Sequence, residues 1–165
     1  MRNWVRVLHI LAFAIPSGLV AAQSGVERPP PLGARDFHLG PVSEGTDSLT
    51  VLRRIGKPDS IRTEAAAPDV RAKLIIWHYH HFRLYFTELS IHGVMAVEAS
   101  DPTYATPRGL RVGDSSTRLK SRYGEPTGTH RDTWDYSDPN SSIHLLRFTV
   151  QDGRVRTIYV GWILD

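Results

Sequence analysis

Two spacings of hydrophobic residues follow one another along the chain. Leu49, Leu52 and Ile55 recur every third residue, which places them on one face of a short helix. Over residues 146–150 and 158–162 apolar and polar residues alternate instead, which is typical of strands with one buried face. The pattern therefore predicts an α+β fold in which short helices cover one face of an antiparallel sheet.

The helical segment and the strands after it occur twice. Residues 45–58 align with residues 113–126 at an offset of 68, and each segment has Asp or Ser where a helix begins and Gly-x-Pro where it ends. The motif Trp-x-Tyr recurs at residues 77–79 and 134–136, and a glycine turn precedes a closing strand in both copies. We therefore expect two tandem units, each a short helical segment packed on a three- to four-stranded antiparallel sheet.

These units and the residues before them divide the chain into four segments. Residues 1–22 form a predicted signal peptide, because two arginines precede an apolar run that ends in small residues. Residues 23–36 contain three consecutive prolines and are predicted to be an extended linker. The first helix-plus-sheet repeat then covers residues 37–102, and the second covers residues 103–165.

The N-terminal signal indicates where the protein works. Cleavage after Ala22 leaves Gln23 as the first residue and delivers the protein to the periplasm or to the outside of the cell. An uncleaved membrane anchor is the alternative, although Pro16 and Gly18 interrupt the apolar run. We expect cleavage, export and no membrane span in the mature protein.

Charge and cysteine content narrow the possible functions. The 20 basic and 17 acidic residues give a net charge of +3, which falls to +1 when Arg2 and Arg6 leave with the signal. A surface so nearly neutral argues against nucleic-acid binding. The sequence has no cysteine, which excludes disulfides, thiolate metal sites, a cysteine nucleophile and a lipid anchor on cysteine.

The tandem pattern of helix, Gly-x-Pro, Trp-x-Tyr and hairpin resembles a known fold. It is similar to the beta-lactamase inhibitor protein and to the small outer-membrane assembly lipoproteins of the SmpA/OmlA (BamE) type, over residues 37–165. The most specific pieces are residues 108–115 and 123–126. The resemblance implies an exported, non-enzymatic domain that offers a sheet surface to a protein partner, a concave surface in the inhibitor. This chain departs from both families, because it lacks the lipid-attachment cysteine of the lipoproteins and the disulfides of the inhibitor.

Alternation also predicts which side of the sheet lies under the helices. In the first unit we expect Leu84 and Phe86 to be buried, and Tyr85 and Thr87 to be exposed. The predicted core residues of the second unit are Leu146, Phe148, Val150, Ile158, Val160 and Trp162. The opposite, wetter side is predicted to carry Arg147, Thr149, Thr157 and Tyr159.

Aromatic residues and one arginine are the candidate protein-binding residues. Tyr85, Arg147 and Tyr159 share the predicted open side of the sheet, and aromatic rings with arginine are the usual anchors of protein interfaces. Four further aromatics recur in both units and are candidates for binding or for the core: Trp77, Tyr79, Trp134 and Tyr136. We expect a module that binds another protein in the cell envelope or outside the cell, as an inhibitor, an immunity protein or an envelope-assembly factor.

A small-ligand or metal site is the alternative function. His78 and His80 stand two residues apart in a predicted strand, so both would face one side of the sheet and could share a metal ion. Histidines that are merely solvated on a half-exposed strand are the other interpretation of this pair. The candidates for a further ligand are Glu88, His92, His130 and His144.

The sequence carries no recognised catalytic motif. Ser48, Asp114 and Ser115 stand where helices need N-terminal caps, and no Gly-x-Ser-x-Gly elbow surrounds either serine. An acid/base hydrolase built from carboxylates in turns and at strand edges is a third hypothesis. We expect no catalytic residues and no cofactor.

Overall fold

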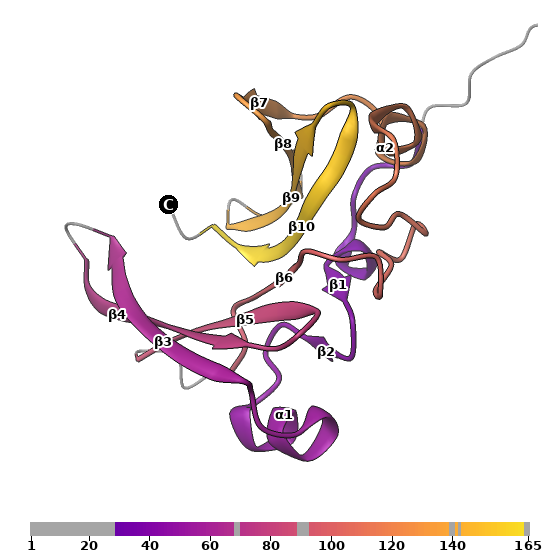
Figure 1. The fold of residues 1–165 in the computed structure, drawn as a ribbon. Helices are drawn as coiled ribbons and strands as arrows, with labels where there is room; N and C mark the ends of the chain where they lie inside the picture. The colour runs from indigo at the N-terminus through magenta and orange to yellow at the C-terminus, as the bar shows by residue number, and fades with distance from the viewer. Residues whose placement is uncertain (1–28, 68–69, 89–92, 139–140, 142, 164–165) are drawn as a thin grey trace, which may run out of the picture.

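The described residues form an α+β fold with two α-helices, one large antiparallel sheet and one small sheet (Figure 1). The computed structural model describes residues 29–67, 70–88, 93–138, 141 and 143–163. The elements are η1 (Ala34–Asp36), β1 (His38–Leu39), β2 (Val42–Ser43), α1 (Ser48–Ile55), β3 (Ser60–Ala67), β4 (Val70–His78), β5 (Phe82–Thr87), β6 (Ala96–Ala99), α2 (Ser116–Tyr123), β7 (Gly128–His130), β8 (Thr133–Ser137), β9 (His144–Gln151) and β10 (Arg154–Trp162).

The large sheet has eight strands in the order β3-β4-β5-β6-β10-β9-β8-β7. All neighbouring strands are antiparallel, and each run of four is a meander in chain order or its reverse. The two runs meet where β6 pairs with β10, from Ala99 opposite Ile158 to Ala96 opposite Gly161. Strands β1 and β2 form the separate small sheet.

The two helices begin and end as the sequence predicts. The Asp47 side chain accepts a hydrogen bond from the Thr50 amide at 2.9 Å, and the Ser115 side chain accepts one from the Arg118 amide at 3.2 Å. At the other end Gly56 and Gly124 both have a φ of 81°, a conformation that other residues adopt at a cost. Asp47 and Ser115 are thus the N-terminal caps of the two helices.

Each helix end is tied to the sheet by a tyrosine of the Trp-x-Tyr motifs. The hydroxyl of Tyr79 donates to the carbonyl of Gly56 at 3.1 Å, and the hydroxyl of Tyr136 donates to the carbonyl of Gly124 at 3.1 Å. These carbonyls lie at helix ends, where no intrahelical amide is available. The two tyrosines thus hold the helices against the strands that follow them.

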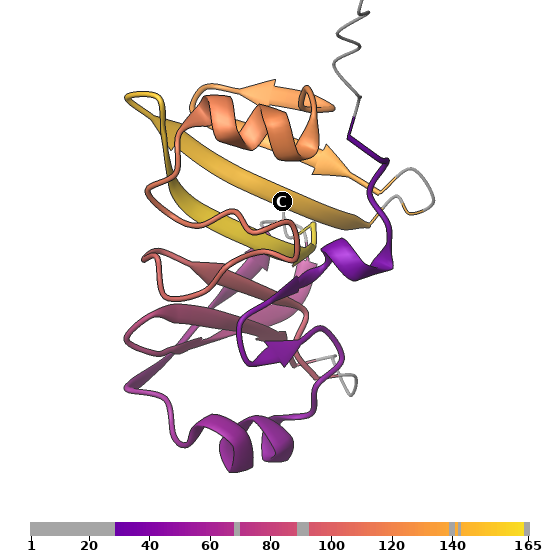
Figure 2. The same cartoon turned by 90° about the vertical axis from the view of Figure 1, so that its right-hand side faces the viewer.

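The main core lies between the sheet and the layer that carries the helices (Figure 2). Leu84 and Phe86 are buried there, as predicted. Of the core residues predicted in the second unit, Trp162 is half-buried and the others are buried: Leu146, Phe148, Val150, Ile158 and Val160. Alternation therefore identified the helix-covered side of β5, β9 and β10 correctly.

The predicted apolar stripe of α1 is wrong. Val51 is the fully buried residue of this helix, Leu52 and Ile55 are half-buried, and Leu49 is 68% exposed. The helix turns the face of Val51 and Ile55 towards the core, four residues apart, which leaves Leu49 on the outer side. A helix of eight residues offers several overlapping apolar stripes, and spacing does not decide among them.

One arginine fastens the N-terminal segment to the rest of the chain. Arg108 makes five hydrogen bonds, at 2.7–3.1 Å, to both carboxylate oxygens of Asp36 and to the carbonyls of Pro30, Pro31 and Arg122. All five N–H groups of the guanidinium thus have acceptors. Residues 30–36 of the predicted linker therefore lie against the fold, while residues 23–28 and the predicted signal peptide lie outside the described residues.

The helices of the described residues lack the combination of length and hydropathy that a membrane span needs, and none of them could cross a bilayer.

Candidate functional site

The side of the large sheet opposite the helices is the candidate site, and we call it the open face. Both helices bury side chains in the core on the other side, and Figure 1 shows this side of the ribbon without a covering helix. Strand register and alternation place the following residues on it: Arg62, Glu64, Leu74, Ile76, His78, Arg83, Tyr85, Ala96, Glu98, Asp135, Leu145, Arg147, Thr149, Thr157 and Tyr159.

The three residues predicted to share the open side lie together near its centre. Tyr159 stands directly opposite Arg147 in the pairing of β10 with β9. The ring centroids of Tyr85 and Tyr159 are 5.8 Å apart, with an angle of 60° between the ring planes. Strand β5 and the hairpin of β9 and β10, which are distant in sequence, thus bring two tyrosines and an arginine into one cluster, in which Tyr159 contacts Tyr85 and stands opposite Arg147.

A row of charged residues crosses the open face through this cluster. Along five neighbouring strands, β5 to β8 by way of β6, β10 and β9, the row reads Arg83, Glu98, Tyr159, Arg147 and Asp135. Arg83 pairs with Glu98 at 2.5 Å, and Arg147 makes two bonds to Asp135 at 2.8 and 3.1 Å. Each pair joins adjacent strands, so the charged groups are held in place without a ligand.

The prediction that Tyr85 is exposed is wrong. Tyr85 is 8% exposed, because it packs with Leu74, Ile76 and Ala96 in a second apolar cluster on the open face. Burial raises its pKa above the ordinary tyrosine value, and the neighbouring Glu98, which accepts its hydroxyl at 2.5 Å, raises it further. Tyr85 therefore belongs to this buried apolar cluster, which we call the apolar floor of the open face. The half-buried Tyr159 and Arg147 are the residues beside it that solvent reaches.

The apolar floor of the open face is not among the features predicted from the sequence. The sequence pattern that indicates it lies in β4. Residues 74–77 are Leu-Ile-Ile-Trp, which places apolar side chains on both sides of the strand. Where β9 begins beside the end of β10, Leu145 is 3% exposed, and the adjoining Ile143 and Ile163 are 45% and 43% exposed. The open face thus combines an apolar floor with the charged row described above.

The four recurring aromatics lie on the helix-covered side, away from Tyr159 and Arg147. They are Trp77, Tyr79, Trp134 and Tyr136. Trp77 packs against Phe86 with ring centroids 4.8 Å apart, and Tyr136 is 2% exposed. Trp134 is half-buried beneath the ammonium of Lys120, which lies 5.3 Å from its ring. The structure therefore separates the seven predicted binding residues into two groups on opposite sides of the sheet.

The two histidines proposed as metal ligands do not share a strand. Strand β4 ends at His78, and His80 lies in the turn that follows, where its ring contacts His81 at 4.5 Å. His78 has the cationic Arg83 as its cross-strand neighbour. Among the described residues no group of three or more His, Asp or Glu side chains could hold a metal ion, and His92 lies outside them.

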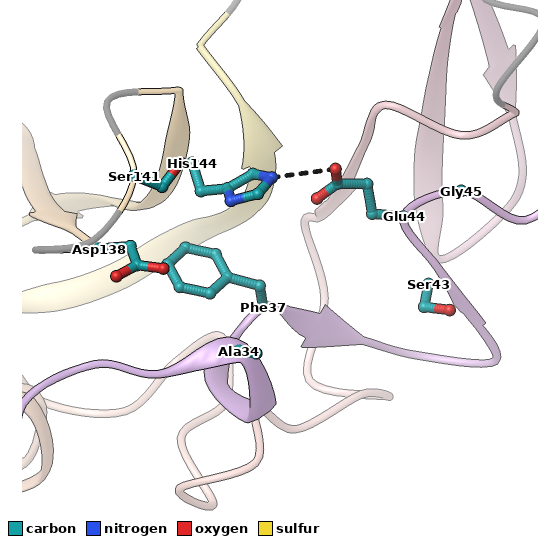
Figure 3. Close-up of a pocket in the computed structure, with 8 residues that line it drawn as sticks. All are labelled: Ala34, Phe37, Ser43, Glu44, Gly45, Asp138, Ser141 and His144. Atoms are coloured by element: carbon teal, nitrogen blue, oxygen red, sulfur yellow. Dashed lines mark hydrogen bonds and ion pairs between the residues drawn. The ribbon is translucent and has the colours of Figure 1, made fainter.

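A pocket of about 680 Å³ lies at the junction of β2 with β9 (Figure 3). His144 and Glu44 face each other across it, with Nε2 and Oε1 3.0 Å apart, and the indole N–H of Trp162 donates to the same carboxylate oxygen. Phe37 packs on the His144 ring at 5.6 Å. These contacts join the N-terminal segment to the central strands. They also occupy His144, so it does not join His78 or His80.

Comparison of the chain with known protein families, curated proteins and solved structures finds no match.

Proposed function

We propose that this chain is an exported, non-enzymatic module that binds a partner protein on the open face. The observation that carries the proposal is the cluster in which Tyr159 contacts the buried Tyr85 and stands opposite Arg147, at the centre of a sheet side that neither helix covers. The proposed binding modes are those of an inhibitor or immunity protein, or of an envelope-assembly factor.

The make-up of the open face suits a protein partner. Protein interfaces combine a hydrophobic centre with a polar rim, and tyrosine and arginine are enriched among the few residues that contribute most of the binding energy. Here the floor of Leu74, Ile76 and Tyr85 lies beside the row of charged residues. Because Glu98 and Asp135 already hold the arginines in position, a partner would order few side chains on docking.

We further infer that residues 37–102 and 103–165 are tandem units of one fold. Each contains a helix of eight residues, and the helices are 68 positions apart from first residue to last. Both glycine caps have the same φ, and both Gly carbonyls accept a tyrosine hydroxyl at 3.1 Å. The order of strands β3 to β6 and β10 to β7 fits two four-stranded meanders joined edge to edge. The resemblance to the beta-lactamase inhibitor protein and to BamE-type lipoproteins rests on the same tandem pattern.

The proposal is tested by capture of partners from envelope and extracellular fractions. The bait is the purified protein, beside a Tyr159→Ala/Arg147→Ala variant and a control variant, Arg54→Ala/Lys57→Ala, altered at exposed positions in and just after α1. Circular dichroism and thermal melting verify that all three fold alike. We expect one protein to bind the native chain and the control but not the open-face variant.

Two results would contradict this proposal. A partner retained by the open-face variant would remove the open face as the binding site, and capture of no protein would remove the binding function. A soluble enzyme bound one to one would identify an inhibitor or immunity protein, while a membrane complex would identify an assembly factor.

A further inference from the structure

The two edges of the large sheet differ in length. Strand β7, at one edge, has three residues, whereas β3, at the other, has eight. Within the described chain β3 pairs with β4 alone, so its outer side presents amide and carbonyl groups along its length. The pairing of β3 with β4 is regular from Ser60 to Ala65, and its register shifts between Ala65 and Ala67. Long edge strands with a regular stretch are surfaces to which another strand can add.

Two opposite charges stand on this edge without an ion-pair partner in the described chain. Arg62 and Glu64 are both exposed, and their positions two apart put them on the same side of the sheet. Their cross-strand neighbours on β4 are Ile76 and Leu74, which carry no charge. The free edge therefore carries one cation and one anion on either side of Thr63.

We propose that β3 pairs with β3 of a second copy of this chain, antiparallel, about a two-fold axis at Thr63. In an antiparallel pair centred on Thr63, Arg62 stands directly opposite Glu64 of the second copy, and Glu64 stands opposite Arg62 of that copy. The symmetry thus makes both ion pairs at once. On the other side of the sheet Ile61, which is 56% exposed, stands opposite Ala65 of the second copy. The two sheets become one continuous sheet.

Charge also selects this register over its neighbours. A shift that centres the pairing on Arg62 places two arginines opposite each other, and one that centres it on Glu64 places two glutamates opposite each other. Like charges in that position destabilise a strand pair. A shift by one residue puts side chains on the wrong side of the sheet. The register about Thr63 is therefore the favoured one.

The test is sedimentation equilibrium of the purified protein over a range of concentrations, with charge-reversal variants. Glu64→Arg makes both cross-strand pairs cationic, and Arg62→Glu makes both anionic, so each variant alone should dimerise about tenfold more weakly or not at all. The double variant Arg62→Glu/Glu64→Arg restores opposite charges and should dimerise like the native chain. A mixture of the two single variants should form heterodimers for the same reason.

Three results would overturn the proposal. The native chain could remain monomeric up to millimolar concentration. The single variants could dimerise as well as the native chain, or the double variant and the mixture could fail to restore association. Thermal melting of each variant verifies that charge reversal at these exposed sites leaves the monomer folded, so a loss of dimer reports on the edge.

Discussion

Arg108 and Asp36, 72 residues apart in sequence, form a two-bonded ion pair with N–O distances of 2.7 and 2.8 Å. Both side chains are largely buried, with 14% and 10% of their surfaces exposed. The guanidinium also lies over the ring of Tyr123, 4.9 Å from its centroid, and donates hydrogen bonds to the carbonyls of Pro30 and Pro31. The pair therefore joins the N-terminal segment to α2 and its flanking loop.

Replacement of this arginine by lysine should destabilise the protein. Arg108→Lys keeps the positive charge but cannot supply five donors in a plane, so it leaves Asp36 and the proline carbonyls incompletely bonded. We expect a loss of about 2–4 kcal/mol in the free energy of unfolding, measured by urea titration. Arg122→Lys is the matched control. The side chain of Arg122 is exposed, and Arg108 contacts only its backbone carbonyl, which the substitution keeps. An Arg108→Lys variant as stable as this control would refute the anchoring role.

The same pair predicts how stability depends on pH. Burial raises the pKa of Asp36, but hydrogen bonds from Arg108 and the Gly33 amide outweigh it and hold the pKa below its ordinary value of 3.8. A lowered pKa in the folded state adds stability above pH 3.8, and that stability is lost as the pH falls from there through the folded-state pKa. Urea titrations of the native chain below pH 4 should show this loss.

Asp36→Asn isolates the contribution of this carboxylate. The variant should be less stable than the native chain at pH 7 and should lose less stability on acidification. Some dependence should remain, because the pKa values of Asp47 and Asp101 are lowered as well. Equal acid sensitivity of the variant and the native chain would show that Asp36 is not the group responsible.

The pairing of β6 with β10, which joins the two halves of the sheet, should not tolerate a side chain at Gly161. This residue has a φ of 145°, and a Cβ there would clash with the Met95 carbonyl oxygen and with the Ala96 Cα on β6. Gly161→Ala should therefore lower the free energy of unfolding by more than about 2 kcal/mol or prevent folding. Gly33→Ala is the control, since that site has open space and a φ of −140°. Similar melting temperatures for the two variants would contradict the close approach.

The tyrosine that closes each helix should contribute a measurable hydrogen bond. Tyr136→Phe removes the bond to the Gly124 carbonyl in a buried setting and should cost about 1 kcal/mol in urea titration. Tyr79→Phe should cost less, because its bond to Gly56 is exposed to solvent. Tyr104→Phe serves as a control in which the ring is kept and neither helix end is touched. An unchanged stability of Tyr136→Phe would mean that the bond has no net effect.

Local chemistry made part of this fold predictable. Helix caps depend on one side chain and a few neighbouring amides, and Asp47, Ser115, Gly56 and Gly124 occur where the sequence predicts them. The covered sides of β9 and β10 follow from simple alternation.

Contacts between distant residues were not predictable. The ion pair of Arg108 with Asp36 joins residues 72 positions apart, and no local sequence pattern predicts it. Tyr85 was predicted to be exposed because alternation describes a strand by itself, whereas its burial depends on Leu74 and Ile76 of the neighbouring strand. The shared strand face proposed for His78 and His80 failed because β4 ends at His78, a boundary that composition does not mark.

Site-specific photo-crosslinking is a direct test of the binding role of the open face. Because the sequence has no cysteine, Thr157→Cys on the open face and Arg122→Cys on α2 each create one attachment point for a thiol-reactive photo-crosslinker. The labelled proteins are exposed to envelope and extracellular fractions and illuminated. We expect this binding role to give a crosslinked protein from the Thr157→Cys variant and none from the Arg122→Cys variant. The reverse result, or equal crosslinking from both positions, would contradict it.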